Sequence, residues 1–231
     1  MKKLLIVFNI FLFISQTKAQ FWSEGFGTGC NSGQLATAAA FTPSNGAWGI
    51  TSLATAPGNG TDANEWFVSA TENGNAIGAC GSGCGTNRTL HIGSNLAPIF
   101  VDPGAAFLIG ATSNTNKRAE SPTINCTGQN NINLNFKYLG NGAAGQHFCE
   151  VLYSSNNGVA WNVLGVLAPS TAGCLPQGTW TGSTFALPAA CNNNSTVKIG
   201  FRWQNTTAAG TDPSIAIDDI QLSTAAQLTV T

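Results

Sequence analysis

Two adjacent acids, Asp218 and Asp219, interrupt an otherwise apolar segment, Ser214 to Ser223 (SIAIDDIQLS). The segment has the composition of a β-strand, where a carboxylate without a partner is costly. A bound cation would offset that cost. The pair therefore marks a first candidate for a metal site, with Asp219 as the cap of a turn as the alternative.

Residues for acid–base or nucleophilic catalysis are few. The only histidines, His91 and His147, each fall inside a strand pattern, which favours a hydrogen-bonded structural imidazole over a general base. The chain has no His-Glu-x-x-His, no Gly-x-Ser-x-Gly and no Gly-rich phosphate loop. No two glutamates stand out as a pair for glycoside hydrolysis. We therefore expect a non-catalytic protein.

The chain has seven cysteines, and an odd number leaves at least one thiol free or paired between molecules. Cys80 and Cys84 enclose Gly-Ser-Gly, whose small residues allow a local disulfide. A zinc site there is disfavoured because no second cysteine pair or histidine cluster accompanies it. A second disulfide, between Cys174 and Cys191, is predicted to staple the hairpin around Trp180. The sequence does not assign partners to Cys30, Cys126 and Cys149.

Six tryptophans are many for 231 residues, and such rings can stack on the faces of sugars. Three of them occupy inward positions of strand patterns and are expected in the core: Trp66, Trp161 and Trp203. The other three are less constrained by pattern and are the candidates for ligand binding: Trp22, Trp48 and Trp180.

The N-terminus has the features of a secretory signal peptide: Lys2 and Lys3, an apolar run from Leu4 to Ile14, and a polar stretch ending at Ala19. Residues 1–20 are predicted to be cleaved, leaving residues 21–231. The apolar run is short for a bilayer span, and no later stretch approaches the length that a span needs. We expect a secreted protein, extracellular or on the cell surface, without a transmembrane segment after cleavage.

Charged residues are scarce, with nine basic and ten acidic side chains, and three of the lysines belong to the predicted leader. The remaining chain is mildly acidic and has no basic stripe, so we expect no nucleic-acid partner. An extracellular glycan or a surface protein is the expected partner, with self-association as a further alternative.

Short segments that alternate apolar and polar residues recur along the chain between turn signals such as Asn156-Asn157-Gly158. Thr196 to Asn205, for example, places Val197, Ile199, Phe201 and Trp203 on one face. Strands are predicted at residues 21–26, 65–69, 88–93, 119–125, 131–139, 147–154, 161–167, 183–187, 196–205 and 214–223, and a short helix at 34–40. The pattern predicts one all-β domain, a two-sheet sandwich or a barrel.

Several motifs occur in the order that is typical of MAM domains, which are jelly-roll adhesion modules of extracellular proteins. They are Glu120-Ser121-Pro122, the strand from Ile132 to Tyr138, Trp161, Trp180, Val197 to Phe201, and Ile215 to Ile220. The opening Phe21 to Phe26 and the segment Gly60 to Phe67 are more similar to bacterial relatives called choice-of-anchor J domains. The resemblance covers nearly all of residues 21–231. It implies an antiparallel two-sheet β-sandwich of jelly-roll type.

The resemblance also implies a structural calcium site near the sheet ends, built from an early strand, an acidic loop and the late pair of aspartates. Carried over to this chain, the metal ligands are Glu24, Asp62, Glu65, Asp218 and Asp219. Carboxylates are ligands that calcium prefers. The alternatives are that Glu24 pairs with Arg88 or Arg118, and that Asp62 shapes its Gly-Thr-Asp loop.

Three functions follow as alternatives. The first is a non-catalytic adhesion or carbohydrate-binding module with a structural calcium ion. The second is an ancillary domain of a secreted hydrolase. The third is a self-assembling surface or matrix protein, which a free cysteine and a neutral, Asn- and Thr-rich exterior would serve.

Overall fold

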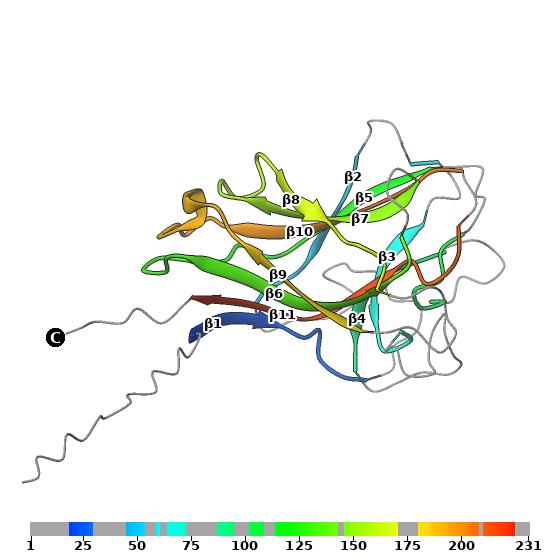
Figure 1. Ribbon diagram of the computed structural model, residues 1–231, viewed down its shortest axis with the longest axis horizontal. Coiled ribbons are helices and arrows are strands. Elements are labelled where there is room, and N and C mark those ends of the chain that lie inside the picture. The colour runs from blue at the N-terminus through cyan, green and yellow to red at the C-terminus, as the bar shows by residue number, and fades with distance from the viewer. Residues whose placement is uncertain are drawn as a thin grey trace, which may run out of the picture.

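The computed structural model describes residues 19–29, 45–53, 59–60, 64–72, 87–94, 102–108, 114–142, 146–170, 180–207 and 210–224. They form two antiparallel sheets that face each other as the layers of a sandwich (Figure 1). The structure thus confirms the predicted antiparallel β-sandwich. No helix within these residues is long and apolar enough to cross a membrane.

The first sheet has six strands in the order β3-β4-β11-β6-β9, with β1 also paired to β11. Their bounds are β1 Ala19–Glu24, β3 Glu65–Ser69, β4 Thr89–Gly93, β6 Ile132–Gly140, β9 Thr181–Ala186 and β11 Ile215–Thr224. Strand β1 begins at Ala19, so the last two residues of the predicted leader pair with β11. Cleavage of that leader stays a prediction.

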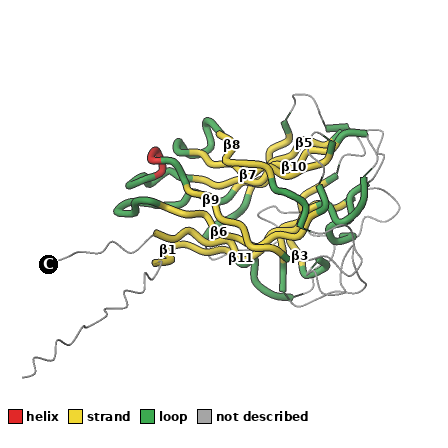
Figure 2. Tube along the Cα trace, in the orientation of Figure 1, coloured by secondary structure: helices red, strands yellow, loops and turns green. Residues whose placement is uncertain are grey.

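The second sheet has five strands in the order β2-β5-β10-β7-β8. Their bounds are β2 Gly49–Ser52, β5 Thr115–Glu120, β7 His147–Ser154, β8 Asn162–Val166 and β10 Lys198–Asn205. A 3₁₀ turn, η2 (Ala189–Cys191), follows β9 at the end of the sandwich where the chain also enters β6; it is the red segment in Figure 2.

The core between the sheets is made by the inward residues of alternating strands. Ile199, Phe201 and Trp203 of β10 are fully buried, while Lys198, Arg202 and Gln204 point the other way, as the period-two pattern predicts. The same alternation buries Leu134 and Phe136 of β6. The largest fully buried side chains are Trp48, Trp66, Trp203, Phe26 and Phe201.

Most of the predicted strands are present, with ends shifted by at most two residues. The exceptions are β2, which the sequence did not indicate, and β5, which spans Thr115–Glu120 where residues 119–125 were predicted. Polar residues such as Asn116, Lys117 and Arg118 make up most of β5, so apolar periodicity does not reveal it. The helix predicted at residues 34–40 lies outside the described residues.

Candidate functional site

Strand β11 changes its partner at the position of the two acids. Along one edge it pairs with β1 near its C-terminal end and with β4 near its start, and Asp218 and Asp219 lie between the two. The ladder with β6 on the other edge shifts register between Asp218 and Gln221. Asp219 has a left-handed φ of 51°, and Phe26, just after β1, has a φ of 54°. Bulges and left-handed residues of this kind are enriched at functional sites.

Asp218 and Glu24 flank this junction, and each is only 6% exposed. Asp218 Oδ1 accepts a hydrogen bond from the Asp219 N–H (2.7 Å), and its Oδ2 accepts one from Asn87 Nδ2 (2.6 Å). Glu24 Oε1 accepts one from the Phe26 N–H (2.8 Å), whereas its buried Oε2 has no hydrogen-bond partner. The indole N–H of Trp48 lies near the Glu24 carboxyl group without reaching hydrogen-bond geometry.

Burial makes both carboxyl groups hard to ionise. It raises the pKa of Asp218 to about 7, with the charge of Asp219 adding to the effect and Lys137 and Asn87 opposing it. Burial also raises the pKa of Glu24, against the hydrogen bond from Phe26. A cation would reverse both shifts, because it favours the ionised carboxylate.

The donors at the junction suit a hard cation. The two carboxyl groups and the Asn87 amide supply oxygen atoms, which are the ligands of calcium, and Glu24 Oε2 has no other partner. The part of the chain that the structure describes contains no group of three or more His, Cys, Asp or Glu side chains that could hold a metal. A calcium ion here would thus take further oxygens from carbonyl groups and water.

Two of the predicted calcium ligands have other partners. Glu65 forms a partly buried ion pair with Lys117, and it lies opposite Gly93, whereas β4 meets β11 at Leu90 and His91. That offset along β4 is roughly 10 Å. Asp219 is exposed and pairs with Lys137 at 2.8 Å. The fifth predicted ligand, Asp62, lies outside the described residues.

The three tryptophans predicted to bind a ligand differ in burial. Trp48 is a core residue, with Phe26 and Phe201 at ring-centroid distances of 5.4 and 6.5 Å, so its assignment as a ligand-binding ring is wrong. Trp22 is half-buried and packs on the main core. Trp180 is half-buried too, packed on the small cluster of Ala105, Leu139 and Ala216.

Trp161, which the sequence placed in the core, lies instead on the solvent side of the five-stranded sheet. It is half-buried, and the Arg118 guanidinium lies 4.3 Å from its ring centroid. Its indole covers Gly200 of β10 so closely that a Cβ atom there would lie 2.7 Å from Trp161 Cζ3. A glycine at an outward strand position, near a tryptophan that follows a turn, is the sequence signal that indicates this arrangement.

Polar side chains surround Trp161 on this surface, which we call the outer face; its members are Thr51, Arg118, Glu120, Glu150, Lys198, Arg202, Gln204 and Trp161. Glu120 accepts hydrogen bonds from Arg118 Nη2 (2.7 Å) and Thr51 Oγ1 (2.6 Å). Glu150 pairs with Arg202 and accepts one from Gln204 Nε2 (3.0 Å). The charged side chains are only 10–24% exposed, so the network holds them in defined positions.

A buried cluster on the six-stranded sheet contains a serine, an aspartate and a histidine. His91 Nε2 lies 2.9 Å from Asp102 Oδ1, and the Ser69 hydroxyl donates to the other oxygen of Asp102. The serine thus bonds to the aspartate and not to the imidazole, which is the wrong order for a nucleophile activated by a base. All three side chains are buried, so this is a structural network, as predicted for His91.

His147 is buried beside Phe107, with ring centroids 5.6 Å apart. Burial lowers the pKa of His147, and its Nδ1 has no hydrogen-bond partner. At His91, the Thr89 hydroxyl lies 3.0 Å from Nδ1, but it donates its proton to the Glu72 carbonyl at 2.8 Å. Thr89 and His91 are both fully buried, so this hydroxyl is closed to a substrate.

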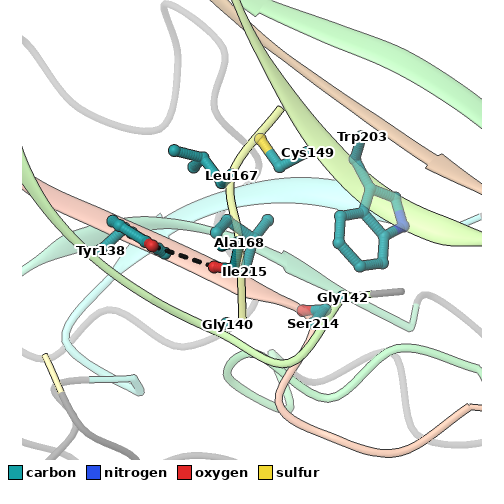
Figure 3. A pocket seen from close by; sticks show the side chains of 9 residues that line it. All are labelled: Tyr138, Gly140, Gly142, Cys149, Leu167, Ala168, Trp203, Ser214 and Ile215. Carbon is teal, nitrogen blue, oxygen red and sulfur yellow. Dashed lines mark hydrogen bonds between the residues drawn. The ribbon is translucent and has the colours of Figure 1, made fainter. Parts of the chain in front are cut away.

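A small pocket lies between the sheets, lined by Tyr138, Cys149, Leu167, Trp203 and Ile215 among others (Figure 3). The Tyr138 hydroxyl donates to the Ala168 carbonyl at 2.9 Å beside it. The pocket has room for roughly one water molecule. A sugar ring does not fit in this pocket.

The described cysteines are buried thiols: Cys126, Cys149 and Cys191. Cys191 was predicted to pair with Cys174, which lies outside the described residues, as do Cys30, Cys80 and Cys84. The Cys80–Cys84 and Cys174–Cys191 disulfides therefore stay predictions.

No family model matches the chain, and no curated protein matches it. Solved structures with a similar fold include the K1 cleaved adhesin domain of Lys-gingipain from Porphyromonas gingivalis (18% identity, 88% of this chain and 97% of that one, TM-score 0.45). Others are the CBM27-1 module of Caldicellulosiruptor saccharolyticus in complex with mannohexaose (14%, 68% and 81%, TM-score 0.40) and a Stig cyclase from Fischerella (14%, 90% and 98%, TM-score 0.40). Binding domains and an enzyme score alike, so the similarity does not select a function.

Proposed function

We propose that this protein is a non-catalytic glycan-binding module that acts outside the cell, with its ligand on the outer face. The observation that carries the proposal is the half-buried Trp161 ring, set on Gly200 and beside Arg118, within a fixed network of arginine, glutamate and amide side chains. A sugar presents an apolar C–H surface and a rim of hydroxyl groups. The outer face offers matching partners for both.

The rigidity of the outer face supports this role. Its charged side chains stand on the central strands β5, β10 and β7 and hold one another by ion pairs, so a ligand would order few additional groups on binding. The indole N–H of Trp161 is buried, so a ligand would contact the ring and not this group. The guanidinium groups of Arg118 and Arg202 add planar donors that suit adjacent hydroxyls or a uronate.

Calcium has a separate, structural role in this proposal. Glu24, Asp218 and Asn87 would supply side-chain oxygens to the ion, and Asp62 stays a predicted further ligand. The ion would hold β1 and the start of β4 against the bulge of β11. Glu24 and Asp218 belong to the six-stranded sheet and Asn87 lies just before β4, whereas the outer face belongs to the other sheet, so calcium would stabilise the module without touching the glycan.

The test is retention of the purified protein on immobilised neutral, uronate-containing and cell-wall polysaccharides. We expect saturable retention on one class, lost in Trp161→Ala and weakened in Arg118→Lys, which keeps the charge but lacks the planar guanidinium. Trp180→Ala, which changes a half-buried ring away from the outer face, is the matched control and should bind normally. Absence of retention on every polysaccharide would contradict the proposal. An ancillary domain of a hydrolase would bind polysaccharide in the same way. It would differ from an independent binding module only in acting beside an enzyme.

Self-association is the second candidate, and the edge strand β8 favours it. Val159, Val163 and Val166 in and before this strand are 85%, 49% and 47% exposed, and β8 carries no charge to discourage pairing with another strand. If β8 pairs between copies, sedimentation should show dimers or larger species, and Val163→Lys should yield monomers. A monomeric wild-type protein at high concentration would exclude this mode of assembly.

A further inference from the structure

Backbone hydrogen bonds join residues 124–129 to residues 193–197 at the end of the sandwich where β6 begins and η2 follows β9 (Figure 1). Backbone N–H groups of Ile124 and Cys126 donate to the carbonyls of Val197 (2.7 Å) and Asn194 (2.8 Å). Asn193 N–H donates to the Gln129 carbonyl at 2.8 Å. These contacts fix the segment around Cys126 against the turn that contains Cys191.

Cys126 and Cys191 are both fully buried and both belong to the main apolar core between the sheets. The two thiols also interact electrostatically. Burial, together with the charge that Cys191 would carry as a thiolate, raises the pKa of Cys126 to about 11, and burial raises the pKa of Cys191 to about 11. Cys126 donates its N–H to Asn194, three residues after Cys191, so the two buried thiols lie on adjacent, hydrogen-bonded segments, as a disulfide requires.

We propose that Cys126 and Cys191 form a disulfide bond when the protein folds in an oxidising compartment. Each thiol loses a proton, and the two sulfurs together give up two electrons to form one S–S bond. A disulfide donor, such as an oxidised dithiol oxidoreductase or oxidised glutathione, takes the electrons and protons and leaves as two thiols. The bond would link the loop before β6 to the turn after β9.

Cys149 is the thiol that this assignment leaves unpaired among the described cysteines. It lies on β7 with its Sγ 3.7 Å from the Glu150 carbonyl oxygen, and it lines the one-water pocket with Trp203. Complete burial raises its pKa well above the ordinary value. A thiol so enclosed cannot reach another molecule without unfolding, so Cys149 is not the residue for an intermolecular bond.

The timing of the reaction follows from burial. In the folded protein both thiols are enclosed and protonated, and only the thiolate attacks a disulfide. The bond must therefore form during folding, before β6 and η2 close over it. A protein folded under reducing conditions should keep both thiols and should react slowly with an added oxidant.

The test is a tryptic map, without reduction, of the protein exported to an oxidising compartment. We expect a cross-link between residues 119–137, which hold Cys126, and residues 138–198. Chymotrypsin, which cuts after Trp180 and Phe185, then separates Cys174 from Cys191 and shows which one carries the link. Cys174→Ser should retain the link and Cys126→Ser should lose it. Free thiols at Cys126 and Cys191, or a link from Cys191 to Cys174, would overturn the proposal.

Thermal unfolding supplies an independent readout. Reduction of the exported protein should lower its melting temperature on the order of 10 °C, because the bond closes a long loop of the unfolded chain. The Cys126→Ala, Cys191→Ala double variant should lose most of this response, because the predicted Cys80–Cys84 bond closes only a short loop, while Cys149→Ala should keep the sensitivity of the wild type. An equal effect of reductant on the double variant would assign the change to another disulfide and contradict the proposal.

Discussion

Asp218 makes the stability of the cation-free protein fall as the pH rises. Its folded pKa is about 7 and its ordinary value is 3.8, so the folded state binds the extra proton between roughly pH 4 and pH 7. Stability is therefore lost across that window as Asp218 is forced to ionise. The cost at full ionisation is on the order of 4 kcal/mol. Calcium would remove it, because the ion favours the ionised carboxylate.

The Asp218→Asn variant tests whether the buried Asp218 charge destabilises the protein and whether calcium offsets that cost. In chelator at pH 8 the variant should melt above the wild type, because the buried charge is gone and the Asn87 amide can turn to accept from the new amide. Calcium should raise the melting temperature of the wild type and leave the variant unchanged. Asp219→Asn is the matched control; it loses an exposed ion pair worth about 0–1 kcal/mol and should keep the calcium response. Equal melting of the wild type in calcium and in chelator would exclude the metal.

The buried pair of His91 and Asp102 has a pH dependence of its own. Burial favours a neutral His91, but the charge of Asp102 and its hydrogen bond win and raise the pKa of His91. Burial opposes ionisation of Asp102, but the charge of His91 and hydrogen bonds from His91 and Ser69 lower its pKa. The Asp102 contribution is lost as the pH falls below its unfolded pKa, and that of His91 as the pH rises through its raised pKa. The pair thus stabilises most between roughly pH 4 and pH 6.5.

We expect Asp102→Asn to lower the free energy of unfolding by about 3–5 kcal/mol near pH 5.5, because it leaves a buried imidazolium without its partner. The loss should become smaller as the pH rises through the raised pKa of His91, so pH 9 is the second condition. Denaturant titrations at the two pH values measure both quantities. Ser69→Ala removes one hydrogen bond from Asp102 and should cost about 1 kcal/mol at either pH. A loss for Asp102→Asn that does not change with pH would mean that His91 is uncharged in the fold.

Residue types were easier to predict than residue neighbours. The sequence singled out Asp218 and Glu24, and both flank the junction in the structure. It also grouped Glu65 with them, because the offset along β4 and the ion pair with Lys117 depend on strand pairing that no local pattern contains. Trp161 was placed in the core for the same reason: periodicity shows which face a residue takes only after the strand bounds are known.

At the scale of elements, periodicity predicted the strands that have one apolar face, such as β6, β7 and β10. It missed β2, which has only four residues, and misplaced β5, whose outward side is polar and whose inward side includes Lys117. These two strands complete the five-stranded sheet and the outer face. The proposed binding surface therefore could not be assembled from the sequence, although most of the fold could.

Gly200→Ala is the test at this scale. The new methyl group would lie 2.7 Å from Trp161 Cζ3 and 3.2 Å from the Ala119 carbonyl oxygen, so the indole must lift from β10. We expect a loss of about 1–3 kcal/mol in unfolding free energy and weaker glycan retention. Gly182→Ala is the matched control, because β9 leaves open space around the added methyl, and it should change neither. If Gly200→Ala unfolds like the wild type, Trp161 does not rest on the sheet as described.

At the scale of the whole molecule, three different parts of the sandwich would have three different roles. The junction of β1, β4 and β11 would hold a cation, the end with η2 would hold a disulfide, and the outer face of the five-stranded sheet would bind. The first two act on stability and the third on the ligand, so variants of one should leave the others intact. The charged residues of the outer face pair largely with one another, so they form a network separate from the acids of the junction.

The central claim is that the outer face binds a glycan, and its most direct measurement is the dissociation constant for the polysaccharide that retains the protein best, determined for wild type, Trp161→Ala and Trp180→Ala. We expect at least a tenfold weaker affinity for Trp161→Ala, a loss of about 1.4 kcal/mol or more, and an unchanged affinity for Trp180→Ala, with all three proteins shown to be folded. Equal affinity of wild type and Trp161→Ala would contradict the account and move the binding surface elsewhere on the sandwich.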